Sequence, residues 1–266
     1  MKLKYSNLYI LAVLVLALAG TQSCKQKKET ALSTEEVVTQ EADFVSIFNG
    51  KTLENWEGDP NYWRVENNSI VGEVTPDKPL KKNTFLIYKD NKLGDFELKA
   101  EFRIAKDGNS GINYRSELLD SVPFALRGYQ ADIDGQNRYT GQNYEERKRT
   151  TLAYRGEKAV ISSQEHPNEE GSLQANVQHN AWQSREVVAS LGASDELKEK
   201  IKPEEWNTCH LIIKGNRLQH YINGVLMSDV VDEDEVNRKL SGYLGVQVHV
   251  GPPMKVEYRN ILLKKL

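Results

Sequence analysis

Apolar and polar residues alternate one by one through much of the chain beyond residue 44. Between residues 96 and 104 every second side chain is apolar, and the side chains between them are charged. The same period of two returns at 112–115, 129–134 and 246–250. Because successive side chains of a strand point to opposite faces of its sheet, each segment is predicted to be a strand. One face of each strand would line a core, and the other would be polar.

Turn signals and the scarcity of helix extend this prediction to the fold class. Asn223-Gly224 separates the strands predicted at 218–222 and 225–228, and this dipeptide is typical of a two-residue hairpin turn. Helical character is confined to one short segment, 194–201. We therefore predict an all-β fold in which two antiparallel sheets pack as a sandwich or jelly roll.

The N-terminus has the pattern of an export signal. Lys2 and Lys4 precede an apolar run from residue 8 to 19, which is shorter than the ~20 residues that span a bilayer. Cys24 follows after a short stretch of small and polar residues. This order predicts a lipoprotein signal peptide over 1–23 and a lipid on Cys24 that anchors the protein to a membrane. An ordinary secretory signal with an incidental cysteine is the alternative.

A polar segment connects this signal to the strand-rich region. Residues 24–43 contain no aromatic side chain and many charged ones, so we predict a disordered tether followed by one domain over 44–266. The residues directly after Cys24 are basic rather than acidic, which favours a periplasm-facing anchor in the outer membrane. The chain has a formal net charge of −3 and no basic block after the tether, so nucleic acid is not an expected partner.

The polar faces of the predicted strands carry an unusual set of side chains. They are short or have planar hydrogen-bonding groups, rather than the Lys, Glu and Thr of an ordinary solvated face. The set comprises Asn113, Arg115, Glu117, Gln130, Asp132, Asp134, Gln247 and His249. On a curved sheet these groups could converge in one groove that binds sugar hydroxyls, with aromatic residues stacking on sugar rings. The candidate aromatic residues are Trp56, Tyr62, Trp63, Tyr139, Tyr144 and Trp182, of which Trp63 also fits a core strand. Hydrogen bonds between strands on an exposed face are the alternative.

Several sequence motifs, taken in order, resemble one family. They are GNSGINYRSE (108–117), GYQADID (128–134), YEERKR (144–149), EEWN (204–207), INGV (222–225) and GVQVHVGPPMKVEYRNILLKKL (245–266). The start of the domain, FVSIFNGKTLENWEG (44–58), is also similar. Together these motifs resemble the 3-keto-disaccharide hydrolase domain family, which is common among secreted proteins and lipoproteins of Bacteroidetes.

The resemblance implies a concanavalin A-like jelly roll that acts on glycosides whose sugar carries a ketone at carbon 3. Such a ketone acidifies the hydrogen on carbon 2, so that a base can remove it and the aglycone leaves by elimination. Water then adds to the enone. This chemistry needs a base, an acid for the leaving oxygen and a group that polarises the ketone.

The resemblance also suggests roles for the residues of the polar faces. Asp132 would be the base or a metal ligand, His249 would protonate the leaving oxygen or hold a metal, and Arg115 would polarise the ketone or hold hydroxyls. The expected substrate-binding residues are Asn113, Gln130, Gln247, Tyr144 and Glu146. Asp134 and Glu117 are candidate ligands for a divalent cation such as calcium, although no cofactor is certain.

Two other functions remain open at this point. A non-catalytic carbohydrate-binding module on the same fold would need stacking aromatics and amides but no base and acid. A structural surface lipoprotein would have no groove where the polar faces converge. If the protein is an enzyme, sugar 3-oxidoreductases that make the ketone are its expected partners.

Overall fold

The computed structural model describes residues 43–90, 92–163 and 184–266. The predicted signal peptide, Cys24, nearly all of the predicted tether and Trp182 lie outside these residues. None of the described helices is long and apolar enough to cross a membrane. Strands are the main regular structure of the described chain, which has one short helix, α3 (Ser194–Lys198), where a longer helix was predicted.

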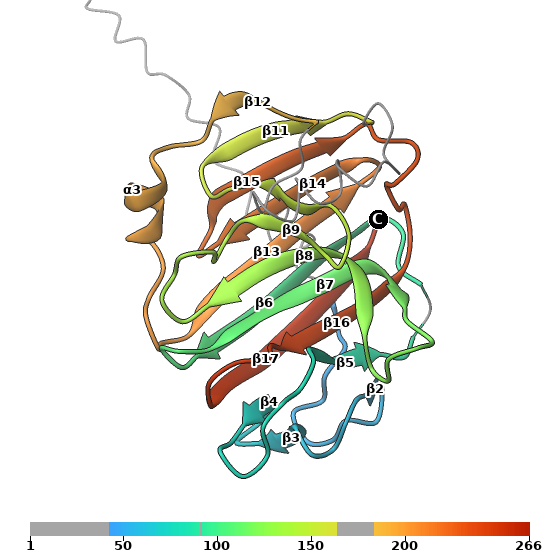
Figure 1. Ribbon diagram of the computed structural model, residues 1–266, viewed down its shortest axis with the longest axis vertical. Helices are drawn as coiled ribbons and strands as arrows, with labels where there is room; N and C mark the ends of the chain where they lie inside the picture. The colour runs from blue at the N-terminus through green and yellow to red at the C-terminus, as the bar shows by residue number, and fades with distance from the viewer. Residues whose placement is uncertain (1–42, 91, 164–183) are drawn as a thin grey trace, which may run out of the picture. The chain divides into compact units, whose positions relative to one another are not determined.

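Two sheets form the domain, and Figure 1 shows the smaller one in front of the larger one. In spatial order the larger sheet contains β12 (Arg185–Ser190), β11 (Glu157–Ile161), β15 (Val225–Asp232), β14 (Arg217–Ile222), β13 (Asn207–Lys214), β6 (Phe96–Ile104), β17 (Met254–Lys265), β4 (Ser69–Val74) and β3 (Trp63–Glu66), with β1 (Val45–Ser46) beside β17. The seven-stranded sheet contains β10 (Thr150–Ala153), β9 (Asn143–Glu146), β8 (Leu126–Asp134), β7 (Asn109–Leu118), β16 (Tyr243–Val248), β5 (Thr84–Tyr88) and β2 (Trp56–Glu57). The predicted all-β, concanavalin A-like jelly-roll sandwich is confirmed.

The side chains that alternate between apolar and polar in the sequence alternate between buried and partly exposed in the structure. Along β6, every second side chain is buried between the sheets and those between are partly exposed. Leu98 of β6 pairs with Leu211 of β13, and both are buried. The β14–β15 hairpin turns at Asn223 and Gly224, whose φ values of 50° and 79° match the turn predicted for this dipeptide. The hydrophobic core therefore lies where the pattern places it.

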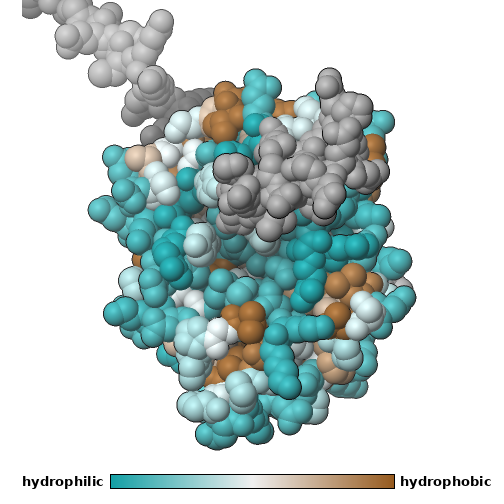
Figure 2. All heavy atoms as spheres, viewed as in Figure 1, coloured by the Kyte–Doolittle hydropathy of each residue, from teal (hydrophilic) through white to brown (hydrophobic). Residues whose placement is uncertain are grey.

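The outer face of the seven-stranded sheet has two different halves. On one half Phe85, Ile87 and Leu126 form a small apolar cluster. The connection between β7 and β8 folds back toward it, and the backbone N–H of Phe85 donates to the carbonyl of Phe124 at 2.9 Å. The other half, around Gln130 of β8, is polar. Figure 2 shows this face as largely hydrophilic, with hydrophobic patches in its lower part.

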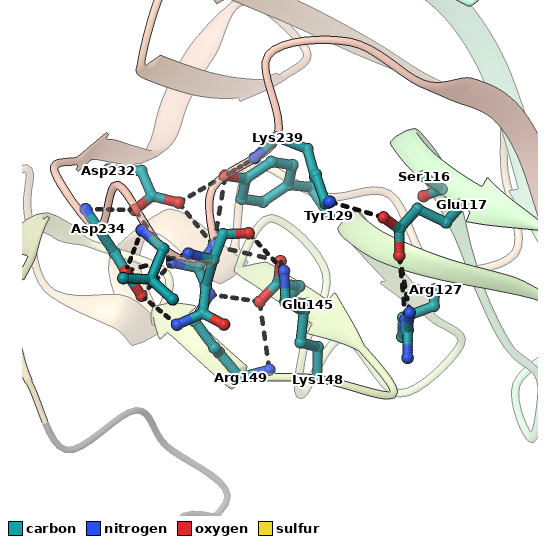
Figure 3. Close-up of polar contacts among 12 residues, drawn as sticks. Ser116, Glu117, Arg127, Tyr129, Glu145, Lys148, Arg149, Asp232, Asp234 and Lys239 are labelled. Carbon is teal, nitrogen blue, oxygen red and sulfur yellow. Dashed lines mark hydrogen bonds and ion pairs between the residues drawn. The ribbon is translucent and has the colours of Figure 1, made fainter. Parts of the chain in front are cut away.

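A cluster of charged side chains is buried between the two sheets. Arg149 forms an ion pair with Glu145 of β9. It also pairs with Asp232, at the end of β15 in the other sheet, and with Asp234, which follows β15. The hydroxyl of Tyr129 donates to Asp232 at 2.5 Å. Figure 3 shows these side chains pointing toward one another around the Arg149 guanidinium. We call these five residues the Arg149 cluster, and it ties β9 to the opposite sheet.

Candidate active site on the outer face of the seven-stranded sheet

A pocket of about 180 Å³ opens on the polar half of this face. Its lining comes from β7, β8 and β9, from the β8–β9 connection and from the end of β16, and comprises Asn109, Gln130, Asp132, Tyr139, Gln142, Tyr144, Glu146 and His249. A cavity of roughly 150 Å³ holds one benzene ring, so this pocket is sized for a single six-membered ring. Six residues predicted for the site are brought together here, namely Gln130, Asp132, Tyr139, Tyr144, Glu146 and His249.

Asp132 lies in this pocket with only 8% of its surface exposed. The side-chain amide of Gln130 donates to its Oδ1 at 2.5 Å, and that of Gln142 donates to its Oδ2. Burial raises the pKa of Asp132 to about 7, helped by the negative charges of Glu146 and Asp134 and opposed by the two amides. A carboxyl group that titrates near neutral pH can take up a proton and release it again under ordinary conditions.

Gln130 is itself held in place by a neighbouring strand. Gln247 of β16 donates from its Nε2 to the Oε1 of Gln130 at 3.2 Å. The Gln130 side chain crosses β7 at Gly111, where an added Cβ would lie 2.6 Å from its Cδ. Glycine is therefore needed at position 111 to let the amide reach Asp132. We call Gln130, Gln142 and Gln247 the glutamine cradle.

Gln142 is fixed from the interior by a buried histidine. The Nδ1 of His220 lies 3.2 Å from the backbone carbonyl of Gln142, and its Nε2 lies 2.8 Å from the hydroxyl of Tyr114. Burial lowers the pKa of His220 to about 4, so the ring is neutral at pH 7. The neutral ring donates from Nδ1 to Gln142 and accepts at Nε2 from Tyr114, which assigns its tautomer.

Tyr144 and Glu146 face the pocket because they alternate along β9 with Glu145, which faces the interior. Burial, followed by the charges of Glu146 and Asp132, raises the pKa of the Tyr144 hydroxyl, which therefore stays protonated and can donate a hydrogen bond. Glu146 accepts from the side-chain amide of Asn83 at 3.1 Å.

His249 stands at the pocket rim, directly after β16. Its Nδ1 lies 2.6 Å from the carbonyl of Val250, so this nitrogen carries a proton and Nε2 is left for other partners. The backbone N–H of Val250 donates to Asn83 at 2.9 Å, and that of His249 donates to the carbonyl of Asn109 at 3.2 Å. These bonds hold the end of β16 against β7 and the chain before β5.

The structure does not place Arg115 in the pocket where it was predicted to act. A register shift lies between Tyr114 and Glu117, and Arg115 itself has a φ of +45°. This bulge breaks the alternation of β7 and buries the guanidinium, which is 1% exposed. It donates to the carbonyls of Gly94 and Gly215 and to the Asp95 carboxylate, at 3.0, 2.6 and 2.7 Å. Arg115 therefore fastens loops and lies outside the pocket lining.

The structure does not bring together Asp134 and Glu117, the two predicted metal ligands. Asp134 pairs with Asn109 at one end of the β7–β8 ladder, and Glu117 pairs with Arg127 near the other end. Hydrogen bonds and ion pairs from Lys239 and Arg127 lower the pKa of Glu117 to about 2. Across the described residues, no three His, Cys, Asp or Glu side chains are grouped to hold a metal ion. Asp134 instead accepts backbone N–H groups that shape the loop before β9.

Asn113 and Gln247 lie beneath the pocket rather than in its wall. Both side chains are 0% exposed, so the structure does not place them in the pocket wall where they were predicted to bind sugar hydroxyls. Gln247 acts on the pocket only through Gln130, as described above. Both polar atoms of the Asn113 amide and the Oε1 of Gln247 are buried without a hydrogen-bond partner.

Two residues of the pocket were not singled out from the sequence. Gln142 and Asn109 both lie outside the strand segments that the alternation predicts. Gln142 has the same parity as Tyr144 and Glu146, so extending the alternation of β9 backward by two residues would have found it. Asn109 likewise shares its parity with Gly111 and Asn113 on β7.

Comparisons with known proteins agree with this architecture. A 3-keto-disaccharide hydrolase of Bacteroides thetaiotaomicron is 28% identical over 104 residues, a match that spans 36% of this chain and 36% of that protein. Two crystal structures of candidate glycosyl hydrolases from Parabacteroides distasonis have the same fold. Their TM-scores are 0.51 and 0.52, with 19% and 16% identity, over 88% and 84% of this chain and 98% and 99% of theirs.

The family comparison covers almost the whole described domain. The model of the 3-keto-alpha-glucoside-1,2-lyase-like domain matches residues 43–264. The matched segment contains both sheets and every residue of the pocket. The chain therefore belongs to the 3-keto-alpha-glucoside-1,2-lyase-like domain family.

Proposed function

We propose that this domain cleaves the glycosidic bond of 3-keto-glucosides by elimination across carbons 1 and 2, with Asp132 as the base. The observation that carries the proposal is the carboxylate of Asp132, which is buried and bonded only by neutral amides in a pocket sized for one sugar ring, so that its pKa rises to about 7. The ideal pKa of a general base lies near the working pH. Family membership and the named relative from Bacteroides thetaiotaomicron also support it.

The reaction begins when the Asp132 carboxylate takes the proton from carbon 2 of the sugar. The electron pair of that C–H bond forms the double bond between carbons 1 and 2, and the bond from carbon 1 to the aglycone oxygen breaks. The leaving oxygen takes up a proton. Water then adds to the enone, with its hydroxyl at carbon 1 and a proton returned to carbon 2, which yields the 3-keto sugar.

Two residues supply the remaining functions. His249 can donate from Nε2 when it is protonated, since its Nδ1 is engaged by Val250, and it protonates the leaving oxygen. Tyr144, whose hydroxyl stays protonated, donates to the ketone oxygen and takes the place first predicted for Arg115. Glu146 and Gln142 line the same pocket and orient the sugar hydroxyls.

Turnover of a 3-keto-glucoside with a chromogenic leaving group tests this proposal. Asp132→Asn should lower kcat by at least about 100-fold, because an amide cannot accept the carbon 2 proton. Glu117→Gln is the matched control, since it also neutralises a carboxylate but lies outside the pocket lining. Binding of the sugar without turnover by the unaltered protein would favour a carbohydrate-binding module instead.

We also propose that Cys24 carries a lipid that anchors the domain at the periplasmic side of the outer membrane, where sugar 3-oxidoreductases would supply its substrate. The signal pattern before Cys24 supports the anchor. Mass spectrometry of the mature N-terminal peptide should find a lipid on Cys24. An unmodified N-terminus beginning at another residue would contradict the anchor without touching the catalytic proposal.

A further inference from the structure

The pocket around Asp132 leaves little room for anything beyond one ring. Its volume of about 180 Å³ is close to the roughly 150 Å³ that holds a single benzene ring. If a sugar fills it, the group attached at carbon 1 must lie outside. A second hollow, of about 420 Å³, lies between the β4–β5 connection and the β7–β8 connection. We call it the outer hollow, and the side chains that define it are Tyr62, Leu80, Lys81, Asn83, Val122 and Phe124.

Asn83 joins the outer hollow to the pocket. It lines the hollow, and its side chain donates to Glu146 of the pocket at 3.1 Å. Its Oδ1 accepts from the backbone of Val250 at 2.9 Å, next to His249 of the pocket rim. The buried Asn83 amide therefore bonds to one residue of the pocket, Glu146, and to the backbone next to another, His249, while it also lines the hollow. A glycoside whose sugar lies in the pocket can extend past Asn83 into the hollow.

The walls of the outer hollow differ in chemistry from those of the pocket. Tyr62 and Leu80 are partly buried and pack against the main core, while Val122 and Phe124 are partly exposed on the facing loop. The polar groups Lys81, Lys82 and Asp59 also line the hollow. The pocket, in contrast, is lined by amides, carboxylates, a histidine and tyrosines. Apolar walls with a few polar groups are typical of sites for aromatic or apolar ligands.

Phe124 adds an independent observation. Its φ is +51°, which is a genuine outlier for a bulky side chain. The hydrogen bond from the Phe85 backbone to the Phe124 carbonyl, at 2.9 Å, holds it in this conformation. Strained residues of this kind cluster where a ligand is bound.

We propose that the outer hollow binds the aglycone of the substrate and that this aglycone is aromatic. The inference rests on the proposed function, because it takes the sugar of the same substrate to lie in the pocket. The hollow has more than twice the roughly 150 Å³ needed for benzene, so it accommodates a two-ring aromatic group such as naphthyl. A second sugar would place hydroxyl groups against Leu80, Val122 and Phe124 without hydrogen-bond partners there.

The test compares two substrates that share the sugar: methyl 3-keto-α-glucoside and 2-naphthyl 3-keto-α-glucoside. For each variant the ratio of kcat/KM, naphthyl over methyl, is divided by the same ratio for the unaltered protein, so that the difference in leaving group cancels. Leu80→Ser and Val122→Ser should each lower this ratio about tenfold, since apolar contacts of this size discriminate ligands to that extent. Leu118→Ser, a 45% exposed leucine outside the hollow, should leave the ratio unchanged.

The methyl substrate reports separately on folding and on the proposed reaction. Both hollow variants should keep their kcat/KM for it within about twofold. An unchanged ratio in Leu80→Ser and Val122→Ser would overturn the aromatic aglycone site and leave the proposed function standing. A variant whose kcat/KM falls by the same factor for both substrates keeps its ratio, and this result also counts against the inference. Absence of methyl turnover by the unaltered protein would overturn the proposed function, and this inference with it.

Discussion

Two groups of buried carboxylates lie on opposite faces of β9, and they are held in different ways. On the inner face Glu145, Asp232 and Asp234 surround the guanidinium of Arg149 (Figure 3). On the outer face Asp132 is bonded by the neutral amides of Gln130 and Gln142. The same strand thus contributes Glu145 to an ion cluster and Glu146 to the candidate active site.

The pKa values follow from this difference. Burial pushes the pKa of Asp234 upward, but hydrogen bonds from Asn237 and the charge of Arg149 outweigh it, so the pKa lies below its ordinary value. Burial likewise raises the pKa of Asp132, and there the amides oppose it without supplying a positive charge. A paired carboxylate remains ionised and serves structure. An amide-held carboxylate titrates near pH 7 and is available for proton transfer.

Arg149→Met should produce the largest loss of stability in the domain. It removes the guanidinium that three buried carboxylates share, and breaking a buried ion pair by removing one partner costs about 3–5 kcal/mol of the free energy of unfolding. Urea denaturation at pH 7 measures the loss. The control is Arg64→Met, which removes exposed ion pairs with Glu66 and Glu73 and should cost no more than about 1 kcal/mol. Equal losses in the two variants would contradict a special role for the cluster.

Asp132→Asn should have the opposite effect on stability, and only at higher pH. The pKa of Asp132 is higher in the folded protein than in the unfolded chain, so the folded state binds more protons between about pH 4 and pH 7. The unaltered protein therefore loses stability as pH rises through this window, by an amount on the order of 2–4 kcal/mol. The variant lacks this term and should be the more stable protein at pH 8. Thermal unfolding at pH 4.5 and pH 8 gives the comparison, and parallel curves would argue against the raised pKa.

Gln247→Leu should have the smallest effect, because Gln247 reaches Asp132 only through Gln130. Loss of this bond loosens the Gln130 amide, which opposes the rise in the pKa of Asp132. The acidic limb of the pH–rate profile should shift to higher pH by less than about one unit, with a fewfold loss of kcat at pH 7. Gln219→Leu, on β14 of the other sheet, is the control and should leave the limb in place. If the acidic limb moves equally in both variants, the glutamine cradle does not influence the pKa of Asp132.

Tyr144 and Glu146 were singled out through the family resemblance, not through alternation. Period-two alternation was sufficient to predict the sheets and to place Gln130 and Asp132 on one polar face. It failed at Arg115 because the β7 bulge changes which face each later residue occupies, and an arginine at positive φ has no local sequence signal. Glu117 and Asp134 are apart for a different reason, since the antiparallel pairing of β7 and β8 puts them near opposite ends of the ladder.

The alternation along a strand predicts which face of the sheet a side chain occupies, but not how deeply that side chain is buried. Asn113 and Gln247 share the face of Asp132, yet neighbouring side chains bury them completely, since Gln130 crosses β7 over Gly111. The Arg149 cluster was equally hidden from sequence reasoning. Its carboxylates come from residues 145, 232 and 234, and only the packing of the two sheets brings them to one guanidinium.

The pH dependence of kcat/KM for methyl 3-keto-α-glucoside tests the central claim most directly. If the amide-held Asp132 is the base, kcat/KM should fall tenfold per pH unit below an apparent pKa of about 7, because only the ionised carboxylate accepts the carbon 2 proton. Asp132→Asn should abolish the limb together with the activity. Turnover that stays level down to pH 5 in the unaltered protein, or a limb at about 7 that survives in Asp132→Asn, would contradict the account.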